Sequence, residues 1–486
     1  MRREAVNAIA LVDFGSTFTK LTIAEAGTGR LLAAAQAPTT VETDAMEGYR
    51  DALESALSQA PGRLRITRRL AASSAGGGLR VAAIGLVPDY TAEAARQAAL
   101  NAGARIELML SGRLDGRAIA ALEEAQPEIV LFSGGTDGGQ REQVLENAEA
   151  LSQARIGSRI VVACNRDIAA AVAATVAPRG RVRVVANVLP AIGRLDIEPA
   201  RAAIHDAFIR HVIRGKGLSR AEEFHEAVIM PTPEAVLRAT RLLAQGAGGA
   251  TPADVLVIDL GGATTDVHAA VALKPAPVGI RLAGLPPLPL RRTVEGDLGM
   301  RWSAPGALQA DGDWLEAEGR AVGISPDELR NACARRRRTP DYLPDDPHEE
   351  RLDRALATAC VTHALQRHCG TLKTVYVPGQ GADFEQRGAD LRDVPLVIGT
   401  GGVLGRQAAS EAVLRAALER QAHGALTPRA PTLALDRSYV LASAGLLSTV
   451  DENGARALLA GQGLTAGALR RRTLANAGHD SEPAQL

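Results

Sequence analysis

The sequence predicts an α/β fold with more than one domain. Short apolar stretches alternate with helical stretches through almost the whole chain, which is the pattern of α/β proteins. The 486 residues exceed what a single hydrophobic core usually supports. One unusual strand–turn–strand segment begins near residue 8, and a second segment of the same design begins near residue 255. Both parts of the chain therefore carry the same local motif.

The most regular alternation of strands and helices is expected between residues 81 and 188. Five strands are expected there, at 81–86, 106–110, 129–132, 159–164 and 182–186, with helices between them at 91–102, 114–124, 141–153 and 167–176. The strands are nearly all apolar, as they are when helices cover both faces of a parallel sheet. This region is therefore predicted to be a parallel sheet between layers of helices.

The remaining segments are less regular. Residues 199–246 are expected to be helical, with an interruption at Pro231 and Pro233, and 245–252 is the candidate linker. The Pro-rich stretch 276–289 is expected to be an exposed crossing. Within the polar stretch 311–347, four successive arginines at 335–338 are expected to form a solvated helix end. Further elements are expected at 350–368 (helix), 374–377 and 394–398 (strands), 406–420 and 438–447 (helices).

Composition narrows the class of partner and compartment. The 55 basic and 55 acidic residues balance, so charge gives no reason to expect nucleic acid or an anionic membrane as a partner. No apolar run reaches the roughly 18 residues of a membrane helix, and the run before Asp13 is too short for a signal peptide. The four cysteines form no CxxC pair, which argues against a disulfide framework or zinc site. We expect a cytoplasmic protein.

The two repeated segments share a chemical design. In each, an apolar strand ends in an aspartate, Asp13 or Asp259, which is followed by one residue and then by Gly15 or Gly261. An aspartate at a strand end can hold a divalent cation such as Mg²⁺, often through water. Glycine lets backbone N–H groups approach phosphate oxygens and lets the hairpin turn. Small hydroxylated residues add further donors, listed in chain order as Ser16, Thr17, Thr264 and Thr265.

A single Asp-x-Gly turn is common, but two copies between apolar strands point to a shared ligand. One cation and two opposed donor loops are what a nucleoside triphosphate requires. A third element, Gly399-Thr400-Gly401-Gly402, follows an apolar strand and precedes a helix. Such a loop can pack flat against a purine and its sugar because glycine leaves room. We therefore expect ATP and Mg²⁺ as ligands.

The order of these three elements resembles the actin-like ATPase superfamily, which includes actin, sugar kinases and the heat-shock-70 chaperones. The resemblance implies a two-lobed, ribonuclease H-like fold with an α/β insertion in the first lobe. It implies a phosphate-1 segment at Asp13, Gly15, Ser16, Thr17 and Lys20, a phosphate-2 segment at Asp259, Gly261, Gly262, Thr264, Thr265 and Asp266, and an adenosine loop at Gly399, Thr400, Gly401 and Gly402. Asp13, Asp259 and Asp266 are the expected catalytic residues, with Asp13 and Asp259 holding the metal.

Five further motifs resemble the MutL family of glutamate mutase accessory proteins, which is distinct from the mismatch-repair protein of the same name. They lie at 13–20, 85–95, 131–139, 163–167 and 294–301, and the resemblance covers roughly residues 6 to 450. It implies an ATP-driven chaperone or reactivase whose partner is an adenosylcobalamin-dependent mutase subunit. The implied organisation is a first lobe at 1–250 with an insertion at about 80–190, a second lobe at 251–465, and a disordered tail at 466–486.

Three other functions stay open at this point. A small-molecule kinase uses the same cleft, but it needs a general base beside the acceptor hydroxyl, and no recognisable substrate motif supplies one. A scaffold could use nucleotide only as a switch. An electron-transferring activator would need cysteines around an iron–sulfur cluster at a subunit interface, which the scattered cysteines argue against.

Three weaker features remain. The loop 133–139 is either an anion-binding loop at a helix N-terminus or a flexible turn. Asn165, Arg166 and Asp167 are expected to cap the helix that follows them. Glu295 and Asp297 are expected in a solvated turn rather than beside a catalytic water.

Overall fold

The fold is built on two five-stranded sheets with the same strand order. A computed structural model describes residues 5–40, 45–74, 79–215, 227–247, 250–377, 381–406 and 410–464. In lobe I the order is β3 (Leu31–Pro38), β2 (Phe18–Glu25), β1 (Val6–Phe14), β4 (Leu64–Ser73) and β10 (Val228–Pro231). In lobe II it is β14 (Leu290–Glu295), β12 (Thr265–Ala270), β11 (Val255–Leu260), β17 (Leu396–Thr400) and β18 (Thr432–Leu435).

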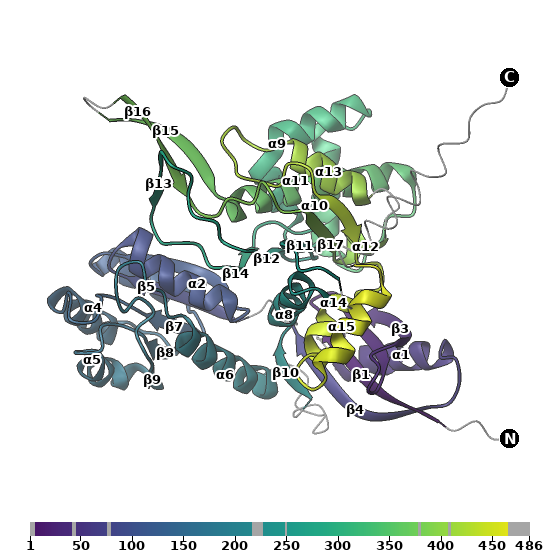
Figure 1. The fold of residues 1–486 in the computed structure, drawn as a ribbon, viewed down its shortest axis with the longest axis horizontal. Helices are drawn as coiled ribbons and strands as arrows, with labels where there is room; N and C mark the ends of the chain where they lie inside the picture. Colours follow the sequence, from purple (N-terminus) through teal and green to yellow (C-terminus); the bar gives the residue numbers. More distant parts are fainter. Residues whose placement is uncertain are drawn as a thin grey trace.

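Strand direction is duplicated as well as strand order. In each sheet the first three strands pair antiparallel, and the fourth and fifth run parallel to the first. This duplication confirms the predicted two-lobed actin-like fold. Figure 1 shows the two sheets on opposite sides of the central helices.

The parallel sheet predicted between residues 81 and 188 is present. It has the order β6 (Arg105–Ser111), β5 (Arg80–Gly85), β7 (Ile129–Phe132), β8 (Arg159–Val162) and β9 (Val182–Val184), and all neighbouring strands are parallel. Its helices are η1 (Pro88–Ala92), α2 (Glu93–Asn101), α3 (Gly116–Ala125), α4 (Glu142–Gln153), α5 (Ala169–Val176) and η2 (Ala177–Arg179). These elements, residues 80–184, are called the inserted unit, because they lie in sequence between β4 and β10, which are neighbours in the lobe I sheet.

Helices flank both lobes. α1 (Ala45–Ser58) packs on lobe I, and α6 (Glu198–Gly215) packs against α2 and β10. α9 (Ala304–Ala321), α10 (Pro326–Arg338), α11 (Pro347–His368), α12 (Gly402–Arg406) and α13 (Ser410–Glu419) belong to lobe II. α8 (Thr232–Ala244), α14 (Val440–Leu447) and α15 (Glu452–Gly461) lie between the lobes (Figure 1). None of the described helices is both long and apolar enough to span a membrane.

Two expectations about secondary structure were wrong. The stretch 199–246 is not helical throughout, because Val228–Pro231 forms β10, and its apolar residues pair with β4. The stretch 276–289 is not only an exposed crossing: Ile280–Ala283 forms β13, which joins β16 (Gly381–Arg387) and β15 (Thr371–Val377) in a three-stranded sheet that projects from lobe II (Figure 1). The expected tail at 466–486 lies outside the described residues.

A shared core joins the lobes. It contains one face of β1 and β4, one face of β11 and β17, and the helices α8, α14 and α15. α14 crosses α8 so closely that a Cβ atom on Gly445 would lie 1.8 Å from the carbonyl oxygen of Ala235. Glycine at this crossing therefore sets the distance between the two central helices.

This close contact predicts the effect of a single methyl group. Gly445→Ala should lower the free energy of unfolding by about 2 kcal/mol or more, because the helices must separate to accept it. Gly461→Ala, at the end of α15 where nothing lies within 4 Å, is the matched control. It should change stability by less than about 1 kcal/mol, with the helix propensity of alanine favouring it. Urea denaturation of both variants measures this, and equal stabilities would contradict the crossing.

Candidate functional site

Side-chain alternation brings the two repeated aspartates together. On β1, Ile9 and Leu11 belong to the core between the lobes, and Asp13 is the next residue on that face. On β11, Val255 and Val257 belong to the same core, and Asp259 is next. Both carboxylates therefore project from strand ends toward the space between the lobes.

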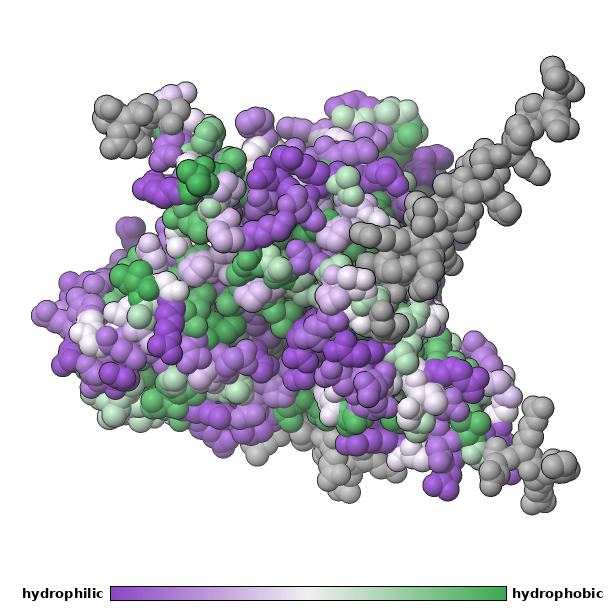
Figure 2. Space-filling view, viewed as in Figure 1, coloured by the Kyte–Doolittle hydropathy of each residue, from purple (hydrophilic) through white to green (hydrophobic). Residues whose placement is uncertain are grey.

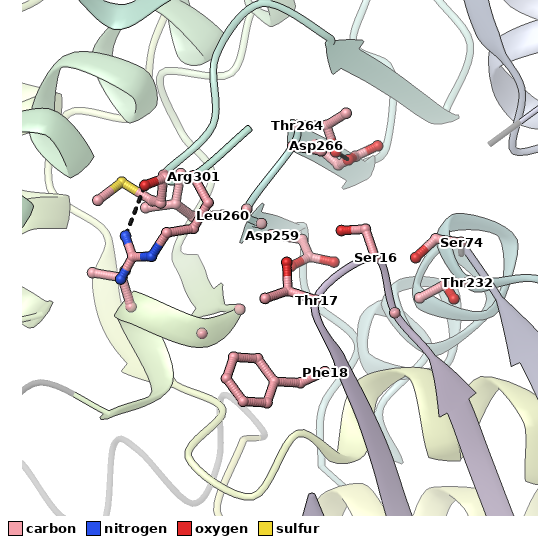
Figure 3. A pocket seen from close by; sticks show the side chains of 18 of the residues that line it. Ser16, Thr17, Phe18, Ser74, Thr232, Asp259, Leu260, Thr264, Asp266 and Arg301 are labelled. Atoms are coloured by element: carbon pink, nitrogen blue, oxygen red, sulfur yellow. Dashed lines mark hydrogen bonds between the residues drawn. The ribbon is translucent and has the colours of Figure 1, made fainter. Parts of the chain in front are cut away.

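That space is a cleft of about 570 Å³, within the usual range for small-molecule sites. Its lining includes twelve of the predicted residues: Asp13, Gly15, Ser16, Thr17, Lys20, Asp259, Gly261, Gly262, Thr264, Asp266, Gly401 and Gly402. Figure 3 shows Ser16 and Thr17 facing Asp259, with Thr264 and Asp266 above them. The structure thus places the first hairpin (β1–β2), the second hairpin (β11–β12) and the 401–402 loop around one cavity.

The first hairpin sets a lysine opposite its aspartate. Asp13 and Lys20 are cross-strand partners, and their Oδ2 and Nζ atoms are 4.0 Å apart. The Thr232 hydroxyl, at the start of α8, donates to Asp13 Oδ1 at 2.5 Å. Burial raises the pKa of Asp13, although Lys20 and Thr232 oppose the shift. Asp13 is therefore held firmly, in surroundings that disfavour its negative charge.

The second hairpin sets two carboxylates opposite each other. Asp259 and Asp266 are cross-strand partners. Burial raises the pKa of Asp259 to about 7, with the neighbouring carboxylates of Asp266 and Asp13 adding to the shift and Lys20 opposing it. Asp266 is already engaged: it accepts from the Thr264 hydroxyl at 2.9 Å and from Arg292 Nε at 2.6 Å. Asp266 is therefore a fixed part of the hairpin wall.

Lys20 is shared among several groups from both lobes. Its ammonium nitrogen lies 4.6 Å from the centre of the Tyr439 ring. Burial lowers its pKa, but the carboxylates of Asp13, Asp259 and Asp436 and the Tyr439 side chain outweigh burial, so the net pKa is raised. Lys20 is therefore a charged group at the floor of the cleft.

The two hairpins nearly touch. A Cβ atom on Gly262 would lie 2.7 Å from Thr17 Oγ1, so a side chain at this position would displace the Thr17 hydroxyl. Thr17 Oγ1 is buried and has no hydrogen-bond partner among the described residues. A buried hydroxyl without a partner is costly, and a ligand oxygen in the cleft would satisfy it.

The motif at 294–301 supports the second hairpin from behind. The backbone N–H groups of Met300 and Arg301 donate to the carbonyls of Gly261 and Gly262, at 3.0 and 2.8 Å. A Cβ atom on Gly299 would lie within 3 Å of the Gly262 and Ala263 backbones. The loop after β14 therefore fixes the shape of the hairpin.

The third wall is the turn from β17 into α12. Gly401 has a φ of +99°, and a Cβ there would lie 2.2 Å from the Leu260 carbonyl oxygen. Three predicted residues do not line the cleft. Gly399 packs against leucine side chains, the buried Thr400 hydroxyl donates to Asp436 at 3.2 Å, and the Thr265 hydroxyl donates to the Leu298 carbonyl at 2.9 Å.

The sequence did not predict a cluster of charged residues at the cleft, called here the charged wall, which consists of Arg301, Asp353 and Arg336. Arg301 lines the cleft and donates to Asp353, which also accepts from Arg336 Nε at 2.8 Å. Arg336 is fully buried, so the prediction of a solvated helix end at 335–338 was wrong for this residue. The ion pair with Asp353 explains its burial, because an arginine is rarely buried without a partner. The sequence spacing of Arg336 and Asp353 does not predict this ion pair, because the two residues lie on different helices, α10 and α11.

Hydrogen bonds join the polar loop 133–139 to the loops that follow the neighbouring strands β8 and β9. Asn165 does not cap the next helix, as was expected: its side chain bonds backbone groups of residues 138–140, and α5 begins later, at Ala169. Asn187 Nδ2 donates to the Gly135 carbonyl and to Asp137, both at 3.0 Å. These bonds make 133–139 a tied loop, so it is not a flexible turn.

Two other expectations are settled by contacts. Asp297 lies in an exposed turn, as expected, whereas the Glu295 side chain at the end of β14 is largely buried; both carboxylates accept from Arg367 of α11, at 2.9 and 2.7 Å. All four cysteines are buried, and burial raises the pKa of the Cys164, Cys360 and Cys369 thiols to about 12 and that of Cys333 to about 11. Buried thiols of this kind could not reach a cluster shared between subunits.

The donor set fits a metal–triphosphate better than a metal alone. Among the described residues no group of three or more His, Cys, Asp and Glu side chains could hold a metal. Asp13 and Asp259 supply two hard oxygen ligands, and Mg²⁺ is commonly held by one or two carboxylates together with phosphate oxygens and water. Lys20, Thr17 Oγ1 and the glycine turns provide the donors that phosphates need.

Comparison with known proteins identifies the family. A family model described as MutL protein matches residues 9–462. Protein MutL of Clostridium tetanomorphum is 38% identical over 447 residues, which are 91% of this chain and 96% of that protein. The chain belongs to the MutL family.

Solved structures are similar to this MutL-family chain only distantly. A glycerol dehydratase reactivase aligns with 92% of this chain and 100% of its own, at 11% identity and a TM-score of 0.35. A ROK family glucokinase from Streptomyces griseus, in complex with glucose and AMPPNP, aligns with 93% of this chain and 98% of its own, at 14% identity and a TM-score of 0.33. At TM-scores this low, neither the ligands nor the residue roles of these proteins can be assigned to this chain.

The buried charged wall yields a stability prediction. Asp353→Asn should destabilise the protein by about 3 kcal/mol, because the buried Arg301 loses its carboxylate partner and the buried Arg336 keeps only Glu349. Asp327→Asn on α10, whose carboxylate is exposed and pairs with Arg330, should cost less than about 1 kcal/mol. Urea denaturation distinguishes the two, and equal losses would show that burial of the network is not what stabilises this wall.

Proposed function

We propose that this MutL-family chain binds ATP with Mg²⁺ in the cleft between its lobes and acts as an ATP-dependent accessory protein of an adenosylcobalamin-dependent mutase. The observation that supports nucleotide binding is the convergence of Asp13, Lys20 and Asp259 with the glycine turns of both hairpins in one cavity. Membership of the MutL family supports the mutase of the glutamate mutase type as the partner.

Each wall has a role in this proposal. The Thr17 hydroxyl and the backbone N–H of Gly262 would donate to phosphate oxygens, and Lys20 would balance their charge. Asp13 and Asp259 would hold Mg²⁺, which withdraws charge from the phosphates. Gly401 and Gly402 would leave room for the adenosine, beside the Arg301 wall.

Hydrolysis would change the interlobe contacts. A γ-phosphate held by both hairpins favours the closed arrangement, and its loss removes contacts from both sides. The lobes would then relax by a population shift, as in other nucleotide-driven switches. Slow turnover alone, and faster turnover with the partner, is the behaviour expected of an accessory chaperone.

A small-molecule kinase is the second candidate, because the cleft has room for an acceptor beside the proposed nucleotide site. Beyond the hairpins the cavity continues to Ser74, Thr232 and Arg105, as Figure 3 shows for Ser74 and Thr232. An acceptor could occupy this end. Asp13, which accepts from Thr232 at this end, is also paired with Lys20, so it is not a free general base.

Nucleotide binding should be visible as a change in melting temperature. Mg²⁺–ATP at saturating concentration should raise the Tm of the full chain by roughly 2–5 °C. Asp259→Asn should remove most of this shift, because the carboxylate would be lost from the centre of the donor set. Asp393→Asn, an exposed partner of Lys274 far from the cleft lining, should keep it. The absence of a shift in the wild type with any nucleotide would refute the proposal.

ATP consumption separates the accessory protein from the kinase. Consumption should be slow for the protein alone and should increase when an inactivated adenosylcobalamin mutase is added. A panel of small hydroxylated and carboxylated acceptors should leave the rate unchanged. Stimulation by an acceptor, with a phosphorylated product and no response to the mutase, would establish the kinase instead.

A further inference from the structure

The turn that joins α2 to β6, residues 100–105, lies at one end of the cleft between the lobes. Gly103 and Arg105 of this turn line the cleft, although they belong to the inserted unit. α2 also packs along β14 of lobe II. Figure 2 shows apolar residues gathered where the inserted unit meets lobe II, within a mostly hydrophilic face. The inserted unit is therefore packed against the nucleotide cleft by its α2 end.

On the lobe I side the turn presses against the start of α8. Gly103 has a φ of +81°, and a Cβ there would lie 2.7 Å from Cβ of Pro231. The next residue, Thr232, holds Asp13 through its hydroxyl. A shift of this turn would therefore press on the Pro231 ring, next to the residue that supports the first hairpin.

On the lobe II side the turn is held by one buried arginine. Arg292 of β14 donates from Nε to Asp266, and from Nη1 to the carbonyls of Leu100 and Ala104, both at 3.0 Å. The Arg292 and Asp266 side chains are only 3% and 7% exposed. One guanidinium therefore joins the second hairpin to the C-terminal end of α2.

The chemistry of this junction suits arginine alone. Carbonyls at a helix C-terminus lack partners within the helix and attract a cation. The planar guanidinium can reach two carbonyls and a carboxylate at once, whereas a lysine carries one nitrogen. Because the pair is buried, it cannot loosen on one side without leaving a charge uncompensated.

We propose that Arg292 is a positioning residue that ties the second hairpin to the inserted unit, so that the inserted unit shifts with the nucleotide state of the cleft. The proposal rests on the nucleotide binding proposed above. Thr264 and Asp266, joined by a 2.9 Å hydrogen bond, form the hairpin end of the connection. Closure of the lobes would move Arg292 and Pro231 toward each other, and the turn between them would carry the displacement into α2.

Hydrogen–deuterium exchange of the full chain tests the connection. In the wild type, Mg²⁺–AMPPNP should slow amide exchange of the peptides covering 93–105 by about fivefold relative to Mg²⁺–ADP, because the turn is clamped between closed lobes. Arg292→Lys should reduce this difference to less than about twofold while saturating nucleotide still raises the Tm. Arg291→Lys is the matched control: it is the same change one residue earlier, on the opposite face of β14, and it should behave as the wild type.

The outcomes separate the two levels of the proposal. A Tm shift in the wild type with no nucleotide-dependent exchange at 93–105 overturns the role of Arg292 and leaves nucleotide binding intact. A full exchange difference in Arg292→Lys overturns it as well. No Tm shift in the wild type refutes the proposed function and this inference with it. If Arg292→Lys does not fold, the wild type still tests the response of the inserted unit: exchange at 93–105 that changes with nucleotide no more than that of α4 overturns the proposal.

Discussion

Three carboxylates, two of them buried and one partly buried, share one ammonium group between the lobes, and much of the structure is arranged around this imbalance. Asp13 comes from lobe I, and Asp259 and Asp436 come from lobe II, while Lys20 lies among them. Burial raises the pKa of all three carboxyl groups. Excess negative charge in a desolvated cleft is unfavourable for folding, and groups of this kind concentrate at functional sites. Because the charges sit on both lobes, whatever neutralises them also acts on the distance between the lobes.

The residues behind the cleft keep this arrangement rigid. Thr232 holds Asp13, Arg292 holds Asp266, and Asp353 holds Arg301. Buried ion pairs add little net stability compared with apolar packing of the same volume, because desolvation offsets the attraction. These three contacts fix the positions of cleft side chains, because each joins a cleft residue to a neighbouring helix or strand. Two glycines add to this: Gly401 allows a backbone contact with Leu260 that any side chain would prevent, and Gly262 leaves room for the Thr17 hydroxyl.

The inserted unit contacts the cleft through the amino-terminal edge of its sheet. Doubly wound sheets usually bind ligands at the carboxyl ends of their strands. In this unit Asn165 bonds the loop after β8 to the loop after β7, and Asn187, just beyond the unit, also bonds the loop after β7. The turn that reaches the cleft, residues 100–105, lies instead at the amino end of β6. The unit therefore meets the cleft by its amino-end turn, while the loops after β7 and β8 are bonded to each other and Asp89, after β5, pairs with Arg387 of β16.

Sequence alone determined the local parts of this protein. Apolar runs ending in Asp-x-Gly predicted both hairpins, because strand burial and glycine turns are properties of neighbouring residues, and the alternating pattern predicted the parallel sheet of the inserted unit. Tertiary structure decided which side chains meet. Thr232, Arg292 and Asp436 came to hold predicted site residues, and Arg336 became buried, through partners on separate elements, so no spacing reveals them. Thr265 and Thr400 were assigned to the ligand but turn to protein partners, because the packing behind each strand, rather than the motif, decides which way a hydroxyl points.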